Sequence, residues 1–204
     1  MIRLAPSGRA FLPELSLLAE HAAAAAAVLR GRLDPGSRGA GHPTNVAAHA
    51  SEADSLAAAV TKSASQALVP PIDREDATDL ASHLRVVVNG LHRLGRLAHT
   101  VGSFVPDAEG VRLADLLVQA TDSLEGAAAT MTERSSALDF AYDVRHVARE
   151  GDRVYVEAIG ALLSATPDSL DAVRQAEMYA ALLESLRDCA AAVAVIERVV
   201  LKRF

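Results

Sequence analysis

The sequence contains few aromatic residues and a single cysteine. Only 3% of its 204 residues are aromatic, tryptophan is absent, and Cys189 is the one cysteine. One cysteine excludes an internal disulfide framework and is typical of a protein from a reducing compartment. Half of the chain is nevertheless apolar, and alanine and leucine, which both favour helices, supply most of that half. The composition therefore predicts an all-α protein.

An excess of positive charge is also missing. The formal net charge is −6, and no basic stripe with interleaved aromatic residues occurs, which argues against a nucleic-acid partner. No stretch of 18 uncharged, strongly apolar residues is present, so we expect no membrane span. Glu14, Glu20 and His21 interrupt an N-terminal segment that would otherwise look like a signal peptide. We expect a cytoplasmic protein that is peripheral to a membrane at most.

Helix-breaking residues divide the chain into six segments in which apolar residues recur at helical spacing. No segment alternates long enough to require a strand. The predicted fold class is an all-α six-helix bundle that forms a single domain over residues 1–204. The expected helices cover about 8–33, 44–67, 74–103, 108–133, 136–164 and 168–202.

Residues 69–76 read VPPIDRED and stand between the second and third expected helices. Two consecutive prolines cannot continue a helix, so Pro70 and Pro71 should end the second one. Asp73 is a plausible N-cap of the third helix, and acidic residues in its first turn favour the positive end of the helix dipole. The residues expected to form this structural turn are Pro70, Pro71, Asp73, Arg74, Glu75 and Asp76.

An internal repeat is visible at a constant offset of 98 positions. SEADSLAAAV begins at Ser51, and REGDRVYVEAI begins at Arg149 with the same acidic spacing. The matched pairs are Glu52 with Glu150, Asp54 with Asp152, Leu84 with Leu182, Val88 with Leu186 and Leu91 with Cys189. The offset predicts two three-helix repeats, at about 8–104 and 105–204.

These features resemble the PhoU-related Pit accessory protein family. The resemblance lies in residues 52–84, EADSLAAAVTKSASQALVPPIDREDATDLASHL, and in EGDRVYVEAIGALL and LLESLRDCAAAVAVIERVVLK of the second half. PhoU is a negative regulator of phosphate uptake and is built from two three-helix repeats. The resemblance implies a non-enzymatic accessory or regulatory protein that binds a phosphate permease or a related regulator at the inner face of the cell membrane.

The family also implies a metal site, because its members bind metal clusters through carboxylates four residues apart. Of eight carboxylates that the resemblance implies, only Asp54 and Asp152 remain. Arg85 and Arg187 occupy two of the other positions, so we expect a degenerate site in which arginine replaces the cation. The candidate metal residues are Asp54, Asp152, Asn89, Glu52 and Glu150. No cofactor is expected, and a divalent or ferric metal is the alternative.

Two other functions stay open at this stage. One is a carboxylate metal-binding bundle, to which His49 with Glu52 or His146 with Glu150 would contribute. The other is a structural oligomerising bundle, and a homodimer is compatible with either. The sequence offers no phosphate-binding glycine loop and no assignable catalytic constellation, so an enzyme is not expected.

Overall fold

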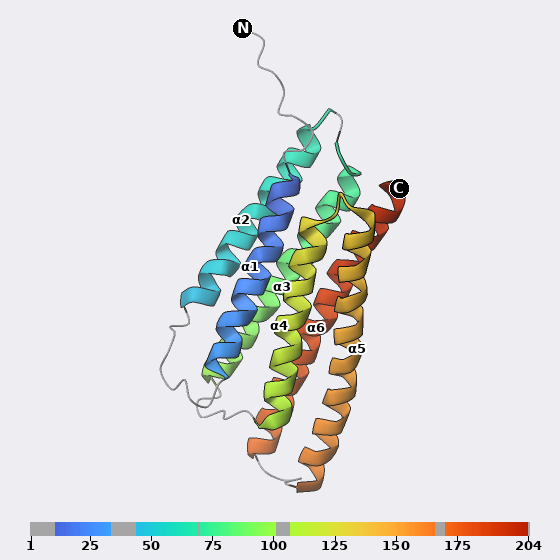
Figure 1. Ribbon diagram of the computed structural model, residues 1–204. Helices are drawn as coiled ribbons and strands as arrows, with labels where there is room; N and C mark the ends of the chain where they lie inside the picture. The colour runs from blue at the N-terminus through green and yellow to red at the C-terminus, as the bar shows by residue number, and fades with distance from the viewer. Residues whose placement is uncertain (1–10, 34–43, 69, 101–106, 166–169, 204) are drawn as a thin grey trace.

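The computed structural model describes residues 11–33, 44–68, 70–100, 107–165 and 170–203, and these ranges form an all-helical bundle (Figure 1). The helices are α1 (Leu12–Arg32), α2 (Thr44–Gln66), α3 (Arg74–Thr100), α4 (Ala108–Ala129), α5 (Arg134–Ala165) and α6 (Leu170–Arg203). No strand occurs within the described ranges, which confirms the predicted all-α fold of six helices.

The helices run alongside one another, with α2 and α5 at opposite edges of the bundle (Figure 1). Helix α1 packs against α2, α3 and α4, whereas α6 packs against α3, α4 and α5. Further contacts join α2 to α3 and α4 to α5. Helices α1, α3, α4 and α6 therefore form the centre, and the two outer helices each present a broad face away from it.

The core consists mainly of leucine, valine and alanine. Alanine on α1 and α4 leaves little side chain between neighbouring helices, which allows their backbones to approach. The apolar residues that recur at helical spacing on α3 and α6 are buried. They are Leu80, Leu84, Val87, Val88, Leu91 and Leu94 on α3, and Met178, Leu182, Leu186, Cys189, Val193 and Ile196 on α6.

Among the described residues, α1 is the one helix whose length and composition would also allow it to cross a membrane. In the bundle its leucines and alanines are core residues, including the fully buried Leu15, Leu18 and Ala22. Packing on three neighbouring helices accounts for the apolar character of this segment.

The turn at residues 69–76 ends one helix and begins the next. Helix α2 ends at Gln66, and α3 begins only at Arg74, with Pro70 and Pro71 outside both helices, as predicted. Asp73 directly precedes α3, and its carbonyl oxygen accepts a hydrogen bond of 2.9 Å from the Ala77 amide. Residues 66–78 are therefore not one continuous helix.

The contact between α5 and α6 depends on a small residue at Gly151. A Cβ atom at this position would lie 2.5 Å from the Leu186 Cδ1 atom, and Leu186 is fully buried and so cannot easily move aside. We expect Gly151→Ala to lower the free energy of unfolding by about 1–3 kcal/mol, as overpacking does. Urea unfolding followed by circular dichroism measures this change.

Gly160 provides a matched control on the same helix, because nothing lies within 4 Å of a Cβ atom there. Gly160→Ala should raise the free energy of unfolding by about 0.4–1 kcal/mol, since alanine restricts the unfolded chain without causing a clash. A Gly151→Ala variant as stable as Gly160→Ala would show that the close approach of α5 and α6 is wrong.

Candidate functional site

Asp54 on α2 faces two polar side chains of α3. The Arg85 Nη1 atom lies 3.5 Å from the Asp54 Oδ1 atom, and the Asn89 Nδ2 atom donates a hydrogen bond of 3.3 Å to the same oxygen. Asp54 and Arg85 are about half exposed. The carboxylate thus has a cation and an amide beside it.

Asp152 on α5 has a similar partner on α6. Arg187 donates to the Asp152 Oδ1 atom from Nη2 at 2.7 Å and from Nε at 3.2 Å. Each of these two aspartates therefore lies beside an arginine of the next helix. Asn89 and Arg187 each stand 35 positions after the aspartate to which they donate.

The two candidate glutamates, Glu52 and Glu150, do not form a metal cluster with these aspartates. Glu150 pairs with Arg112 and Arg153, and the hydrogen bond from Arg153 is the largest cause that lowers the pKa of Glu150. Glu52 is exposed on α2. Within the described ranges, no three histidine, cysteine, aspartate or glutamate side chains come together as a metal site.

We expect the two aspartates to be dispensable for metal content and nearly dispensable for stability. Their ion pairs are half exposed, so Asp54→Asn and Asp152→Asn should each change the free energy of unfolding by about 0–1 kcal/mol. Iron, zinc and magnesium contents after purification without chelator should be the same in the double variant and the wild type. Near-stoichiometric metal in the wild type that is lost in the double variant would show that the two aspartates do bind a metal ion.

The pair Glu184 and Asp188, which has metal-ligand spacing on α6, lies in a cleft against α3. Glu184 forms an ion pair of 2.9 Å with Arg93. Asp188 lies next to Gly90, where a Cβ atom would be 3.3 Å from the Asp188 Oδ2 atom. The cleft has a volume of about 690 Å³ and includes Arg85, Asn89, His92, Arg93, Glu184 and Asp188 in its lining. Its positive and negative side chains are mixed, so the cleft does not select one sign of ligand charge.

Asp188 is poorly solvated for a carboxylate. Burial is the main cause that raises the pKa of Asp188, and the negative charge of Glu184 adds to it. The folded protein therefore holds this proton to a higher pH than the unfolded chain does. Consequently, the ionised carboxylate of Asp188 lowers the free energy of unfolding at neutral pH. This cost shrinks as the pH falls below the pKa that Asp188 has in the folded protein, because the carboxyl group then becomes neutral.

From this sign we predict that Asp188→Asn raises the melting temperature at pH 7. The gain should shrink as the pH is lowered toward 4, because protonated Asp188 is already neutral in the folded wild type. Calorimetric scans at several pH values measure the effect. Asp143→Asn, at an exposed position of α5, is the matched control and should leave the melting temperature unchanged. A melting temperature lowered by Asp188→Asn at pH 7 would show that the ionised Asp188 carboxylate does not destabilise the folded protein.

The turn at residues 69–76 and the first residues of α3 contribute an ion-pair cluster that joins the start of α3 to the end of α6. Asp76 is only 4% exposed and accepts hydrogen bonds from Arg198 Nε at 3.0 Å and Lys202 Nζ at 2.7 Å. Arg198 also pairs with Asp79, and Lys202 lies 3.4 Å from Asp73. The sequence predicted a helix start at this turn but did not predict its partners on α6.

A histidine pair between α1 and α2 was also missed. The Nδ1 atoms of His21 and His49 are 2.9 Å apart, and the ring centroids are 5.2 Å apart. Burial lowers the pKa of His49, and the neighbouring His21 lowers it further. The sequence had paired His49 with Glu52 and His146 with Glu150, whereas the structure stacks His146 on Tyr142.

The start of α4 is tied to α6 through Asp107. Its carboxylate caps α4 by accepting from the Gly110 amide at 2.9 Å, and it also accepts from Gln175 at 2.5 Å and from the Tyr179 hydroxyl. Burial and the nearby Asp107 carboxylate raise the pKa of Tyr179, so this hydroxyl remains a donor. The contact is a structural connection between two helices.

Three arginines follow one another every fourth residue on α5, but two of them already have carboxylate partners. Arg145 pairs with Glu197 of α6 at 2.7 Å, and Arg153 pairs with two glutamates of its own helix. Arg149, between them, donates from Nε to the carbonyl oxygen of Arg145. Most of the positive charge on this row is therefore balanced within the protein.

Comparison with known proteins does not assign a family. A scan against protein-family models finds no match, and a search of curated proteins finds no similar sequence. The family resemblance therefore depends on the residues quoted above, and its functional content is a proposal.

Proposed function

We propose that this protein is a non-enzymatic accessory or regulatory protein of inorganic phosphate transport that acts by binding a phosphate permease or a related regulator. The resemblance of residues 52–84 to the PhoU-related Pit accessory family supports the link to phosphate. The observation that carries the binding role is the pairing of Asp54 with Arg85 and Asp152 with Arg187. With these carboxylates balanced by arginine, the helices need no metal at the family positions, and their outer surfaces are available for a partner.

We also propose that the bundle consists of two three-helix repeats related by an approximate twofold axis. The contacts from Asp54 to Asn89 and from Asp152 to Arg187 span the same number of residues. Helices at equivalent places in the two halves, α1 with α4 and α3 with α6, pack against each other. Gly90 and Asp188, which are 98 positions apart, meet at the second of these contacts, where an axis between α3 and α6 would pass.

The outer face of α5 is the surface that we assign to partner binding. Tyr142, Val156 and Leu163 are 57%, 69% and 57% exposed and recur at multiples of seven residues, so they share one face of the helix. Arg149 stands in the same series. We name Tyr142, Arg149, Val156 and Leu163 the α5 stripe. Exposed large apolar side chains on a common face are typical of interaction sites.

The corresponding face of α2 lacks this character. At the offset of 98, the α5 stripe corresponds to Thr44, Ser51, Ala58 and Ser65, which are small or hydroxyl-bearing. The two outer helices are therefore not interchangeable as binding surfaces, although they occupy opposite edges of the bundle (Figure 1). The α5 stripe suits an apolar segment with a nearby carboxylate, such as a cytoplasmic helix of a permease.

Co-purification with the phosphate permease of the same cell tests this function. The tagged protein and the permease are expressed together, and binding is measured after detergent extraction along with phosphate uptake by the cells. The stripe variant carries Tyr142→Ser, Val156→Ser and Leu163→Ser. We expect wild-type protein to retain the permease and to change its uptake rate, and we expect the stripe variant to do neither.

Leu68 and Leu201 provide the control, because they are large, apolar and exposed but lie outside α5. A variant with Leu68→Ser and Leu201→Ser should bind the permease like wild type. Failure of the wild-type protein to bind the permease or alter uptake would overturn the proposed function. Equal loss of binding in both variants would instead overturn the assignment to α5.

A further inference from the structure

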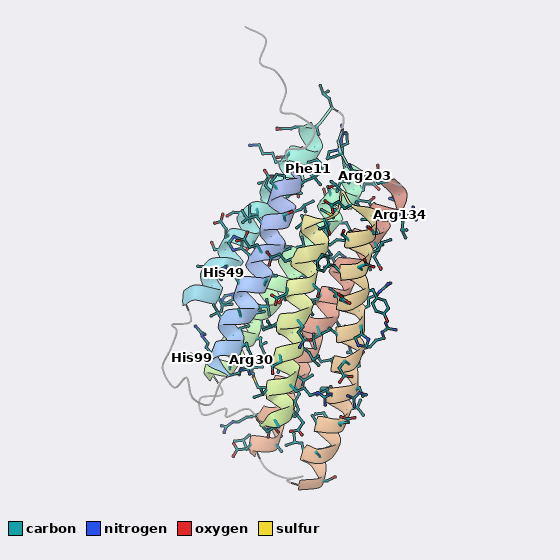
Figure 2. The ribbon with its side chains drawn as sticks, in the orientation of Figure 1. Phe11, Arg30, His49, His99, Arg134 and Arg203 are labelled. Carbon is teal, nitrogen blue, oxygen red and sulfur yellow. The ribbon has the colours of Figure 1, made fainter. Side chains whose placement is uncertain are left out.

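The histidine pair between α1 and α2 brings two metal-binding atoms together at short range. His21 and His49 are 28 positions apart in the chain, yet their Nδ1 atoms are separated by 2.9 Å. Figure 2 shows His49 on α2 near the edge of the bundle. Both side chains are partly buried rather than enclosed, so water can reach the pair. Neutral imidazole is the commonest protein ligand for transition metals.

The separation of the two nitrogens is that of a hydrogen bond in the metal-free pair, and it would change least on binding an ion whose adjacent ligands lie at 90°. With metal–nitrogen bonds of about 2.0–2.1 Å, two nitrogens at 90° around an ion are about 2.9 Å apart, and two at a tetrahedral angle are about 3.4 Å apart. The observed distance of 2.9 Å agrees with adjacent positions of a square-planar or octahedral ion. Cu²⁺ and Ni²⁺ prefer such arrangements, whereas Zn²⁺ prefers a tetrahedron.

We propose that His21 and His49 form a two-histidine site for Cu²⁺ or Ni²⁺ that links α1 to α2, with water in the other coordination positions. In the metal-free neutral pair, one Nδ1–H donates to the other Nδ1. When the ion binds, that proton moves to Nε2 of the same ring, so both Nδ1 lone pairs become ligands without net proton release.

The charges around the pair favour a cation. Glu20 directly precedes His21, and Glu52 follows His49 by one turn of α2. Burial raises the pKa of Glu125 on α4, and the negative charges of Glu20 and Asp122 raise it further, so Glu20 lies near carboxylates of α4. A divalent ion at the histidine pair would reduce this accumulation of negative charge. The site is separate from the aspartate–arginine pairs and does not depend on the proposed function.

Titration calorimetry of the full chain without a histidine tag tests the site. The probes are Cu²⁺, Ni²⁺ and Zn²⁺ in a buffer that does not bind metal, and the Cu²⁺ complex is also examined by electron paramagnetic resonance. We expect one high-affinity equivalent of Ni²⁺, weaker binding of Zn²⁺, and a copper spectrum that reports two imidazole nitrogens. Loss of an outer-shell partner typically weakens metal affinity about 10- to 100-fold, so His21→Gln and His49→Gln should each weaken it at least that much.

His83→Gln and His146→Gln are the matched controls, because these histidines lie on α3 and α5, away from the pair. Both should bind metal like wild type, and circular dichroism establishes that all four variants are folded. The copper spectrum of the wild-type protein tests the site by itself, even if a variant fails to fold. Absence of binding in the wild type, a spectrum without two imidazole nitrogens, or unchanged affinity in both His21→Gln and His49→Gln would each overturn the proposal.

Discussion

Replacing Asp76 with alanine should lower the free energy of unfolding by about 2–3 kcal/mol. The carboxylate is 4% exposed and accepts hydrogen bonds from two cations of α6. Hydrogen bonds to charged groups contribute about 1.5–3 kcal/mol each. The expected loss is below their sum, because the two cations are half exposed and regain water in the variant. Urea unfolding monitored by circular dichroism provides the value.

Glu75→Ala is the control in the same turn, since Glu75 is exposed one residue earlier. Both changes remove one carboxylate from the first turn of α3, so the shared loss of favourable dipole interaction cancels in the comparison. Asp76→Asn should lie between wild type and Asp76→Ala. If Asp76→Ala costs no more than Glu75→Ala, the ion-pair cluster does not stabilise the protein.

The second large effect is expected in the core. Leu84 on α3 is fully buried, and Leu182 on α6 is 1% exposed. Leu→Ala at such positions removes favourable burial and leaves a cavity, which costs about 3–5 kcal/mol. Because the two leucines stand at matching positions of the proposed repeats, Leu84→Ala and Leu182→Ala should have similar costs. The comparison uses the urea concentrations at the unfolding midpoints of the two variants, provided that the slope of the unfolding free energy against urea concentration is the same in both.

Val86 supplies the control for this prediction, because it lies beside Leu84 on α3 but is 42% exposed. Val86→Ala should change the free energy of unfolding by less than about 1 kcal/mol, since little apolar surface is lost from the core. Costs below 1 kcal/mol for both leucine variants would contradict the buried register of α3 and α6.

The order of the helices could be predicted from the sequence because it depends on local patterns. Proline at positions 70 and 71 and apolar residues at helical spacing act over a few neighbours, and the boundaries of α2 and α3 follow from them. The pairing of Asp152 with Arg187 was expected from the family resemblance, because the resemblance implies a ligand position at Arg187 opposite Asp152.

The remaining site contacts could not be predicted, since they depend on how separate helices are placed. His49 has Glu52 one turn away in sequence, but its actual neighbour His21 comes from α1. Asp76 looked like a helix-dipole residue, and only the position of α6 shows that it is a buried acceptor. Helical spacing fixes the face of one helix that a residue occupies but not which helix covers that face.

The partners of Asp76 also affect when the protein can complete its folding during synthesis. Arg198 and Lys202 follow Asp76 by 122 and 126 residues. At typical translation rates, roughly 6–25 s pass between the synthesis of the carboxylate and that of its partners. During this interval α6 is absent, so the part of α3 that packs against α6 stays uncovered, whereas the parts that contact α1 and α2 already have their partners. The buried ion pairs of Asp76 therefore form only after the end of α6 has been translated.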